Sequence, residues 1–142
     1  MKRISTIVAA VMITAIGWAQ SPEKMSYQAV VRDGSNDLIT TQAVGMQISI
    51  LQGGSEGIPV YVETQTPTTN ANGLVNLEIG TGTTSDDFSK IDWANVTYFI
   101  KTETDPIGGT SYTITGTTQL LSVPYALYAK TSGTSAGPQG VK

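Results

Sequence analysis

The carboxylates are the side chains of this sequence best suited to acid–base chemistry. Asp86 and Asp87 are adjacent, and Glu103 and Asp105 lie two residues apart on one face of an expected strand. Glycoside hydrolases use two such groups on either side of a sugar bond. General acid–base catalysis also needs a buried cleft, which a small β-sandwich rarely offers. We therefore interpret the first pair as a helix start and the second as a solvated strand end, and we expect no enzyme.

Metal and thiol chemistry lack their usual ligands. The sequence has no cysteine and no histidine, which excludes disulfides, thiol nucleophiles, imidazole bases and His/Cys metal sites. Asp33, Ser35 and Asp37 resemble the start of a calcium loop. The sixth and twelfth positions of that loop need Gly and an acid, but this sequence has Leu38 and Val44 there. A polar turn explains the pattern better, and we expect no metal and no cofactor.

Aromatic residues suggest a different chemistry, the stacking of sugar rings on an exposed face. The candidates are Trp93, Phe99 and Tyr61. Alternation places Phe99 opposite Tyr98 and Ile100, on the outer face of a two-layer sandwich. The competing interpretation is a role in the core or at an edge, because large aromatic side chains are usually mostly buried.

Composition and charge narrow the class of partner. Hydrophobic residues make up 39% of the 142 residues, enough for one core, while charged residues make up only 13%. Thr, Ser, Asn, Gln and Gly carry the polar surface, as is common in secreted β proteins. The net charge is −3, and removal of Lys2 and Arg3 with a leader leaves 6 basic against 11 acidic residues, or −5. Nucleic acid and anionic lipid need a basic patch, so neither is expected as a partner.

Residues 1–19 have the three parts of a secretory signal peptide. Lys2 and Arg3 give a positive start, residues 4–16 are apolar, and small residues Gly17 and Ala19 precede a cut before Gln20. The apolar run is shorter than the about 20 residues of a membrane-spanning helix. We therefore expect a secreted or cell-surface protein with no membrane insertion after cleavage.

The mature chain predicts one all-β domain over residues 20–121. Alternation of apolar and polar residues indicates strands within residues 25–33, 38–52, 60–68, 74–80, 97–104 and 110–119. Asn72-Gly73 suits a tight hairpin that leads into the fourth strand. Asp86 and Asp87 can cap a helical turn before the fifth strand. About six or seven short strands predict an antiparallel β-sandwich of immunoglobulin-like or transthyretin-like type.

The chain leaves this domain through an apolar segment. Residues 120–121 close the last strand, and residues 122–130 predict a short C-terminal helix, with Ser122 as its cap and Lys130 in its last turn. This helix, the neck, is apolar on nearly every side, so it must be covered either by its own domain or by another chain. The neck residues expected at an oligomer or stalk contact are Val123, Pro124, Tyr125, Leu127 and Tyr128.

Residues 131–142 predict a flexible spacer and the start of a stalk. Residues 131–136 are small and polar, and residues 137–142 form two Gly-X-Y triplets, GPQGVK. A collagen triple helix needs Gly at every third place because only Gly fits its crowded axis. The position of the triplets, after a spacer at the end of a domain, favours a collagen-like stalk.

Three motifs together resemble a known family. Residues 25–33 (MSYQAVVRD), 91–93 (IDW) and 119–129 (QLLSVPYALYA) look like those of secreted Bacteroidota proteins in which an N-terminal β domain precedes a collagen-like or tail-fibre-like region. The resemblance covers nearly the whole mature chain. It implies a trimeric fibrous protein of the surface or the extracellular space, and no enzyme.

Two functions follow as expectations. The first is a structural module that caps or nucleates a collagen-like or fibre-like stalk, as part of a surface or secreted adhesin or fibre, and that self-associates as a homotrimer through the neck. The alternative is a β-sandwich that binds a carbohydrate or another cell-surface ligand through its aromatic residues.

Overall fold

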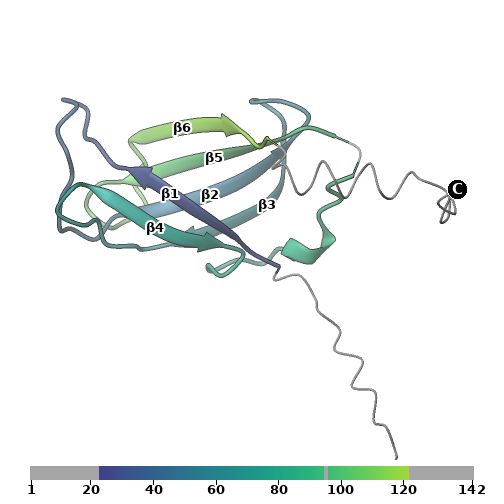
Figure 1. Cartoon of the computed structure of the whole chain (residues 1–142), viewed down its shortest axis with the longest axis horizontal. Helices are drawn as coiled ribbons and strands as arrows, with labels where there is room; N and C mark the ends of the chain where they lie inside the picture. The colour runs from purple at the N-terminus through teal and green to yellow at the C-terminus, as the bar shows by residue number, and fades with distance from the viewer. Residues whose placement is uncertain (1–22, 95, 122–142) are drawn as a thin grey trace, which may run out of the picture.

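The protein folds into two antiparallel sheets, seen in a computed structural model that describes residues 23–94 and 96–121 (Figure 1). One sheet pairs β1 (Met25–Val30) with β4 (Leu74–Ile79). The other has the order β3 (Ile58–Gln65), β2 (Gly45–Gln52), β5 (Tyr98–Asp105), β6 (Ile114–Gln119). The prediction of an all-β antiparallel sandwich is confirmed. The helix predicted over residues 122–130 lies outside the described residues.

The connections between the strands are those of a Greek-key sandwich. Hairpins join β2 to β3 and β5 to β6 within the larger sheet, whereas the other three connections cross between the sheets. If β1 to β6 are named B, C, C′, E, F and G, the two sheets have the strand order of an immunoglobulin-like sandwich. Strands A and D have no counterpart among the described residues.

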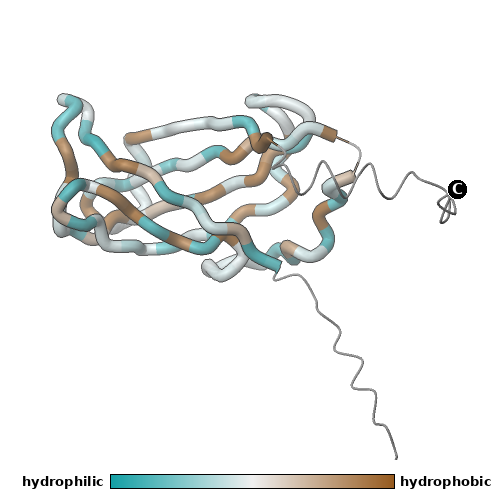
Figure 2. The backbone as a smooth tube through the Cα atoms, in the orientation of Figure 1, coloured by the Kyte–Doolittle hydropathy of each residue, from teal (hydrophilic) through white to brown (hydrophobic). Residues whose placement is uncertain are grey.

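The core lies between the two sheets and is built by alternation. Figure 2 shows apolar and polar residues alternating along the strands. In β4, Val75, Leu77 and Ile79 are buried while their neighbours are exposed. The larger sheet contributes its own row of inward side chains, which includes Met46, Ile48, Ile50, Tyr61 and Ile100. Burial of these apolar side chains is the main favourable contribution to folding.

One prediction about local structure is only half right. The Asn72-Gly73 turn forms, with Gly73 at a φ of 72° and the Asn70 side chain accepting hydrogen bonds from the backbone of Asn72 and Leu74. The strands on either side of it do not form a hairpin, because β3 pairs with β2 and β4 pairs with β1. The segment between them crosses from one sheet to the other, and the backbone N–H of Thr69 donates to the carbonyl of Gln42 on the way.

A short 3-10 helix, η1 (Phe88–Lys90), confirms the helical turn predicted before β5. Asp87 is its N-cap and accepts a hydrogen bond from the backbone N–H of Ser89 at 3.1 Å. The Ser89 hydroxyl donates to the same carboxylate, and this bond lowers the pKa of Asp87. The cap therefore fixes the backbone of this turn, from which the following residues continue to the end of the sandwich.

Within residues 23–94 and 96–121, no helix has both the length and the apolar character needed to cross a membrane.

Candidate functional site

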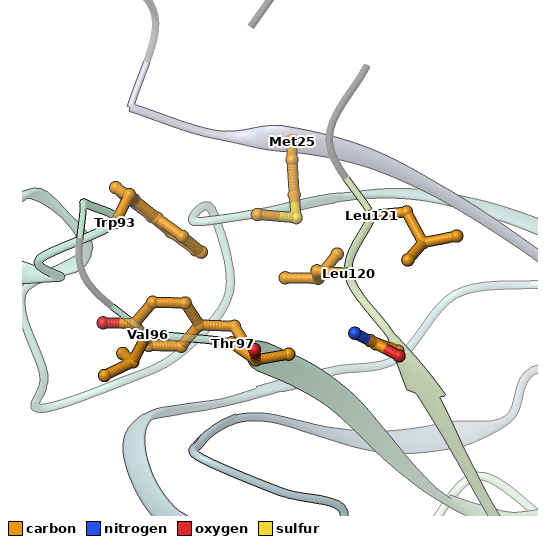
Figure 3. A pocket seen from close by; sticks show the side chains of 8 residues that line it. Met25, Trp93, Val96, Thr97, Leu120 and Leu121 are labelled. Carbon is orange, nitrogen blue, oxygen red and sulfur yellow. The ribbon is translucent and has the colours of Figure 1, made fainter. Parts of the chain in front are cut away.

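An apolar hollow of about 480 Å³ lies at the end of the sandwich where the described chain starts and finishes. Met25 at the start of β1, Trp93 and Val96 after η1, and Leu120 and Leu121 after β6 line it. Figure 3 shows Met25, Trp93 and Leu120 pointing toward one another across this space. The remaining lining residues are Thr97, Tyr98 and Gln119. Among the described residues, no charged side chain lines this hollow, which we call the exit hollow.

Register explains why segments so far apart in the sequence meet at this point. β6 pairs antiparallel with β5, so that Phe99 faces Gln119, and the backbone N–H of Leu120 extends the ladder by donating to Tyr98 at 2.8 Å. The prediction that residues 120–121 close the last strand therefore holds for Leu120. Leu121 lies beyond the ladder, and 77% of it is exposed.

A row of aromatic rings supports one wall of the exit hollow. The ring of Tyr61 meets that of Phe88 edge-on with centroids 5.2 Å apart, Phe88 lies 5.7 Å from Trp93, and Trp93 lies 5.0 Å from Tyr98. Tyr61 and Tyr98 are buried, and burial raises the pKa of both phenols. The row thus runs from the core to Trp93, which is 43% exposed. Contacts of this geometry stabilise the ring positions beyond the effect of area alone.

The three aromatic residues proposed for ligand stacking have three different environments. Trp93 is accessible at the exit hollow, as a stacking role requires. Phe99 lies on the outer face of the four-stranded sheet, as alternation predicted, and is half-buried there. Tyr61 is only 1% exposed, so its ring cannot stack on a sugar. Tyr61 has an inward position on β3, where it belongs to the hydrophobic core.

Glu63 is the one fully buried carboxylate that sequence reasoning did not single out. Its side chain accepts four hydrogen bonds: from the Tyr61 hydroxyl at 2.6 Å, the Gln65 amide at 2.5 Å, and the backbone N–H groups of Gly80 and Gly82 at 2.8 and 3.1 Å. These hydrogen bonds therefore hold the loop that follows β4 against strand β3. The alternation of β3 placed Glu63 on the same face as Tyr61, and that was the only signal in the sequence.

Three of the four carboxylates considered for catalysis accept hydrogen bonds that hold nearby backbone segments in place. Asp86 accepts from the backbone N–H of Val62 at 2.9 Å, and Asp87 caps η1. The interpretation of Asp105 as part of a solvated strand end is wrong, because Asp105 is buried. Its carboxylate accepts from the backbone N–H groups of Ile107 and Ser111 and so shapes the loop between β5 and β6.

Glu103 and the calcium-like loop also have local partners. The Glu103 carboxylate lies 3.1 Å from the Lys101 ammonium. Asp33 accepts from the backbone N–H groups of Ser35 and Asp37 at 2.9 Å, which is an ordinary polar turn. Across residues 23–94 and 96–121, no cluster of three or more acidic side chains is arranged to hold a metal ion.

Sequence reasoning missed most of the exit hollow. It named Trp93 but not Met25, Thr97, Tyr98 or Leu120 as neighbours, because only the strand register brings them together. The neck residues Val123, Pro124, Tyr125, Leu127 and Tyr128 lie outside the described residues. Leu121, the last described residue, lines the hollow directly before them.

Comparison with known proteins gives one match. A family model described as a domain of unknown function (DUF8740) matches residues 26–122, a span that includes nearly all of β1 and every later strand of the sandwich. No curated protein and no solved structure matches the chain.

Proposed function

For this chain, which belongs to the DUF8740 family across its sandwich, we propose the function of a non-enzymatic structural module that caps or nucleates a fibre-like or collagen-like stalk outside the cell. The observation that carries this proposal is the uncovered apolar end of the sandwich. Leu121, Trp93 and Val96 are 77%, 43% and 41% exposed there, and the chain continues from Leu121 into the apolar neck. Exposed apolar clusters of this kind mark surfaces that other chain segments cover.

The neck gives the module a mechanical purpose. The chains of a collagen-like stalk must be brought into register before a triple helix can propagate, and an associating segment directly ahead of the first Gly-X-Y triplet does this. We assign homotrimer contacts to Val123, Pro124, Tyr125, Leu127 and Tyr128. The resemblance of residues 25–33, 91–93 and 119–129 to stalk-bearing Bacteroidota surface proteins supports the same proposal.

Location outside the cytoplasm is part of this proposal. Residues 1–19 have the charged start, the apolar run and the small residues of a cleavable leader, and the mature chain has a net charge of −5 after loss of Lys2 and Arg3. We expect N-terminal sequencing of the exported protein to begin at Gln20. A protein that retains residues 1–19 would contradict the cleaved leader.

The oligomer is tested by light scattering on the chain from Gln20 to Lys142. We expect the mass of a trimer at high micromolar concentration, and a lower mass for the double variant Leu127→Ser, Tyr128→Ser. Ile107→Ser is the matched control, because Ile107 is 80% exposed in the loop at the other end of β5. A monomer at high micromolar concentration would contradict the proposal.

Trp93 favours one second candidate, a carbohydrate- or surface-binding module. Its exposed ring beside a hollow has the geometry on which sugar rings stack, although few polar groups converge there to orient a ligand. This function requires Trp93→Ala to abolish binding on a glycan array. Ile107→Ser, in the exposed loop at the other end of β5, serves as the control. An array without any bound glycan, or binding unaffected by Trp93→Ala, would dispose of this candidate.

A further inference from the structure

The exit hollow is built for an apolar occupant. Met25, Trp93 and Leu120 converge on it from three separate segments (Figure 3). Its polar lining is limited to Thr97, Gln119 and Tyr98, and the Tyr98 hydroxyl already donates to the backbone carbonyl of Asp92. Water in this space would meet mainly apolar side chains, which makes its replacement by an apolar group favourable.

The exit hollow is large enough to hold either a small ligand or side chains from a covering segment. At about 480 Å³ it falls within the roughly 300–1,000 Å³ that ligand-sized pockets occupy. A small-molecule site would also need several convergent hydrogen-bonding groups, and those are few here. A large side chain carried by a peptide needs no such groups, since the rest of its chain fixes its orientation.

We infer that the neck of this same chain fills the exit hollow, with Tyr125 as the side chain that enters it. Tyr125 follows Leu121, a wall of the hollow, by four residues, so an extended backbone carries it at most about 14 Å. The short tether makes the docking intramolecular and raises the effective concentration of the neck to about the millimolar range. A second copy would have to reach the same place by diffusion.

Chemistry also favours Tyr125 among the neck residues. Trp93 packs between Phe88 and Tyr98 in the aromatic row, and its exposed side gives a further ring a surface to pack against. The phenol oxygen of a tyrosine can remain at the open mouth of the hollow while the ring is buried. Residues 122–129 contain no charge, so docking desolvates no charged group.

This inference extends the proposed function and rests on it, because docking of the neck serves a purpose only if a stalk follows the neck. Tyr125 then makes its contact within its own chain, and Val123, Pro124, Leu127 and Tyr128 remain for the contacts with neighbouring copies. Docking would fix the direction in which the stalk leaves the sandwich. The docking itself is a property of a single chain, whereas the trimer is a property of several, and so the two can fail separately.

Trp93 is a built-in reporter for the test. The sequence has two tryptophans, Trp18 and Trp93, and a chain that begins at Gln20 keeps only the second. We expect acrylamide to quench this chain at least about twofold less than its Tyr125→Ser variant, because the docked ring covers Trp93. The control Ile107→Ser should leave the quenching unchanged.

Three results would overturn the inference. Equal quenching of the native chain and the Tyr125→Ser variant would mean that Tyr125 does not cover Trp93. Protection that disappears on dilution to nanomolar concentration would identify a second copy as the occupant. Protection lost equally in the Ile107→Ser control would show a general effect on the fold. A trimer seen by light scattering together with any of these results would leave the proposed function standing.

A disulfide trap gives a second, independent measurement. The native sequence has no cysteine, so the double variant Met25→Cys, Tyr125→Cys contains a single pair. A disulfide needs Cα atoms within about 7 Å, and Met25 lines the hollow that the neck is proposed to fill. We expect an intramolecular bond on oxidation, and none in the control pair Ile107→Cys, Tyr125→Cys. Intermolecular dimers, or no bond at all, would contradict docking in the same chain.

Discussion

Replacement of Glu63 by alanine is the sharpest test of how the sandwich is held together. The substitution removes the acceptor of four hydrogen bonds, from the Tyr61 hydroxyl, the Gln65 amide and the backbone of Gly80 and Gly82. A buried donor left without a partner costs about 1–3 kcal/mol. Water that enters the emptied space recovers part of this cost, so we expect Glu63→Ala to lower the free energy of unfolding by about 3–5 kcal/mol.

The expected loss is large for a domain of this size. Small domains have a total stability of about 5–15 kcal/mol, and each 1 kcal/mol moves their Tm by about 4–8 °C. Glu63→Ala should therefore lower Tm by at least about 12 °C in thermal unfolding followed by circular dichroism. Glu63→Gln should lower it by less than half as much, because a glutamine carbonyl can occupy the position of Oε2, to which three of the four donors point.

Glu78→Ala is the matched control for this experiment. Glu78 is also a strand glutamate, but its side chain is 50% exposed and its partner is the Lys24 ammonium at 2.7 Å. An exposed ion pair of this kind contributes about 0–1 kcal/mol. Equal changes of Tm in Glu63→Ala and Glu78→Ala would refute the reasoning, because they would mean that the buried carboxylate has no greater effect than an exposed one.

Three further predictions address the aromatic row, pH and backbone packing. Phe88→Ala should shift the fluorescence of Trp93 to longer wavelength and cost about 2 kcal/mol in urea unfolding, since a half-buried ring is lost; an unchanged spectrum would contradict the supporting role of the row. Burial raises the pKa of Tyr61, so above about pH 10 only the unfolded chain loses this proton, and stability should fall by up to about 1.4 kcal/mol per pH unit. Below that pH the Tyr61 phenol keeps its proton in both states, so it should not make stability depend on pH. Tyr61→Phe should reduce the fall of the urea midpoint between pH 9 and 11. An equal slope in both proteins would contradict this prediction. Gly45→Ala should destabilise the fold by about 1–3 kcal/mol, because its Cβ would lie 1.9 Å from a backbone oxygen of the β5–β6 loop, whereas Gly34→Ala, with nothing within 4 Å, should be neutral in the same assay.

Alternation allowed the sequence to predict which strands form and which side chains they bury. The period of two in β4 placed Val75, Leu77 and Ile79 inside, and the same period placed Phe99 outside. Asp86 and Asp87 likewise predicted a capped turn, and η1 forms there. These features depend on residues only a few positions apart, and such patterns can be read directly from the sequence.

Pairing between strands was not predictable in the same way. Asn72-Gly73 specified a turn but not its partners, and so the predicted hairpin was wrong: β3 and β4 belong to different sheets. A tight turn fixes the backbone for a few residues only, whereas sheet membership depends on which distant strand offers a free edge and a complementary face.

The sequence by itself determined an all-β chain with an apolar core and a local structural role for most of its acidic residues. Only the tertiary structure decided that Glu63 is buried and accepts hydrogen bonds from four donors. It also decided that Met25, Trp93 and Leu120 meet in one hollow. The physical reason is the register within each sheet together with the packing of one sheet on the other. Met25 lies 68 positions from Trp93 and 95 positions from Leu120, and no local pattern of side chains encodes that meeting.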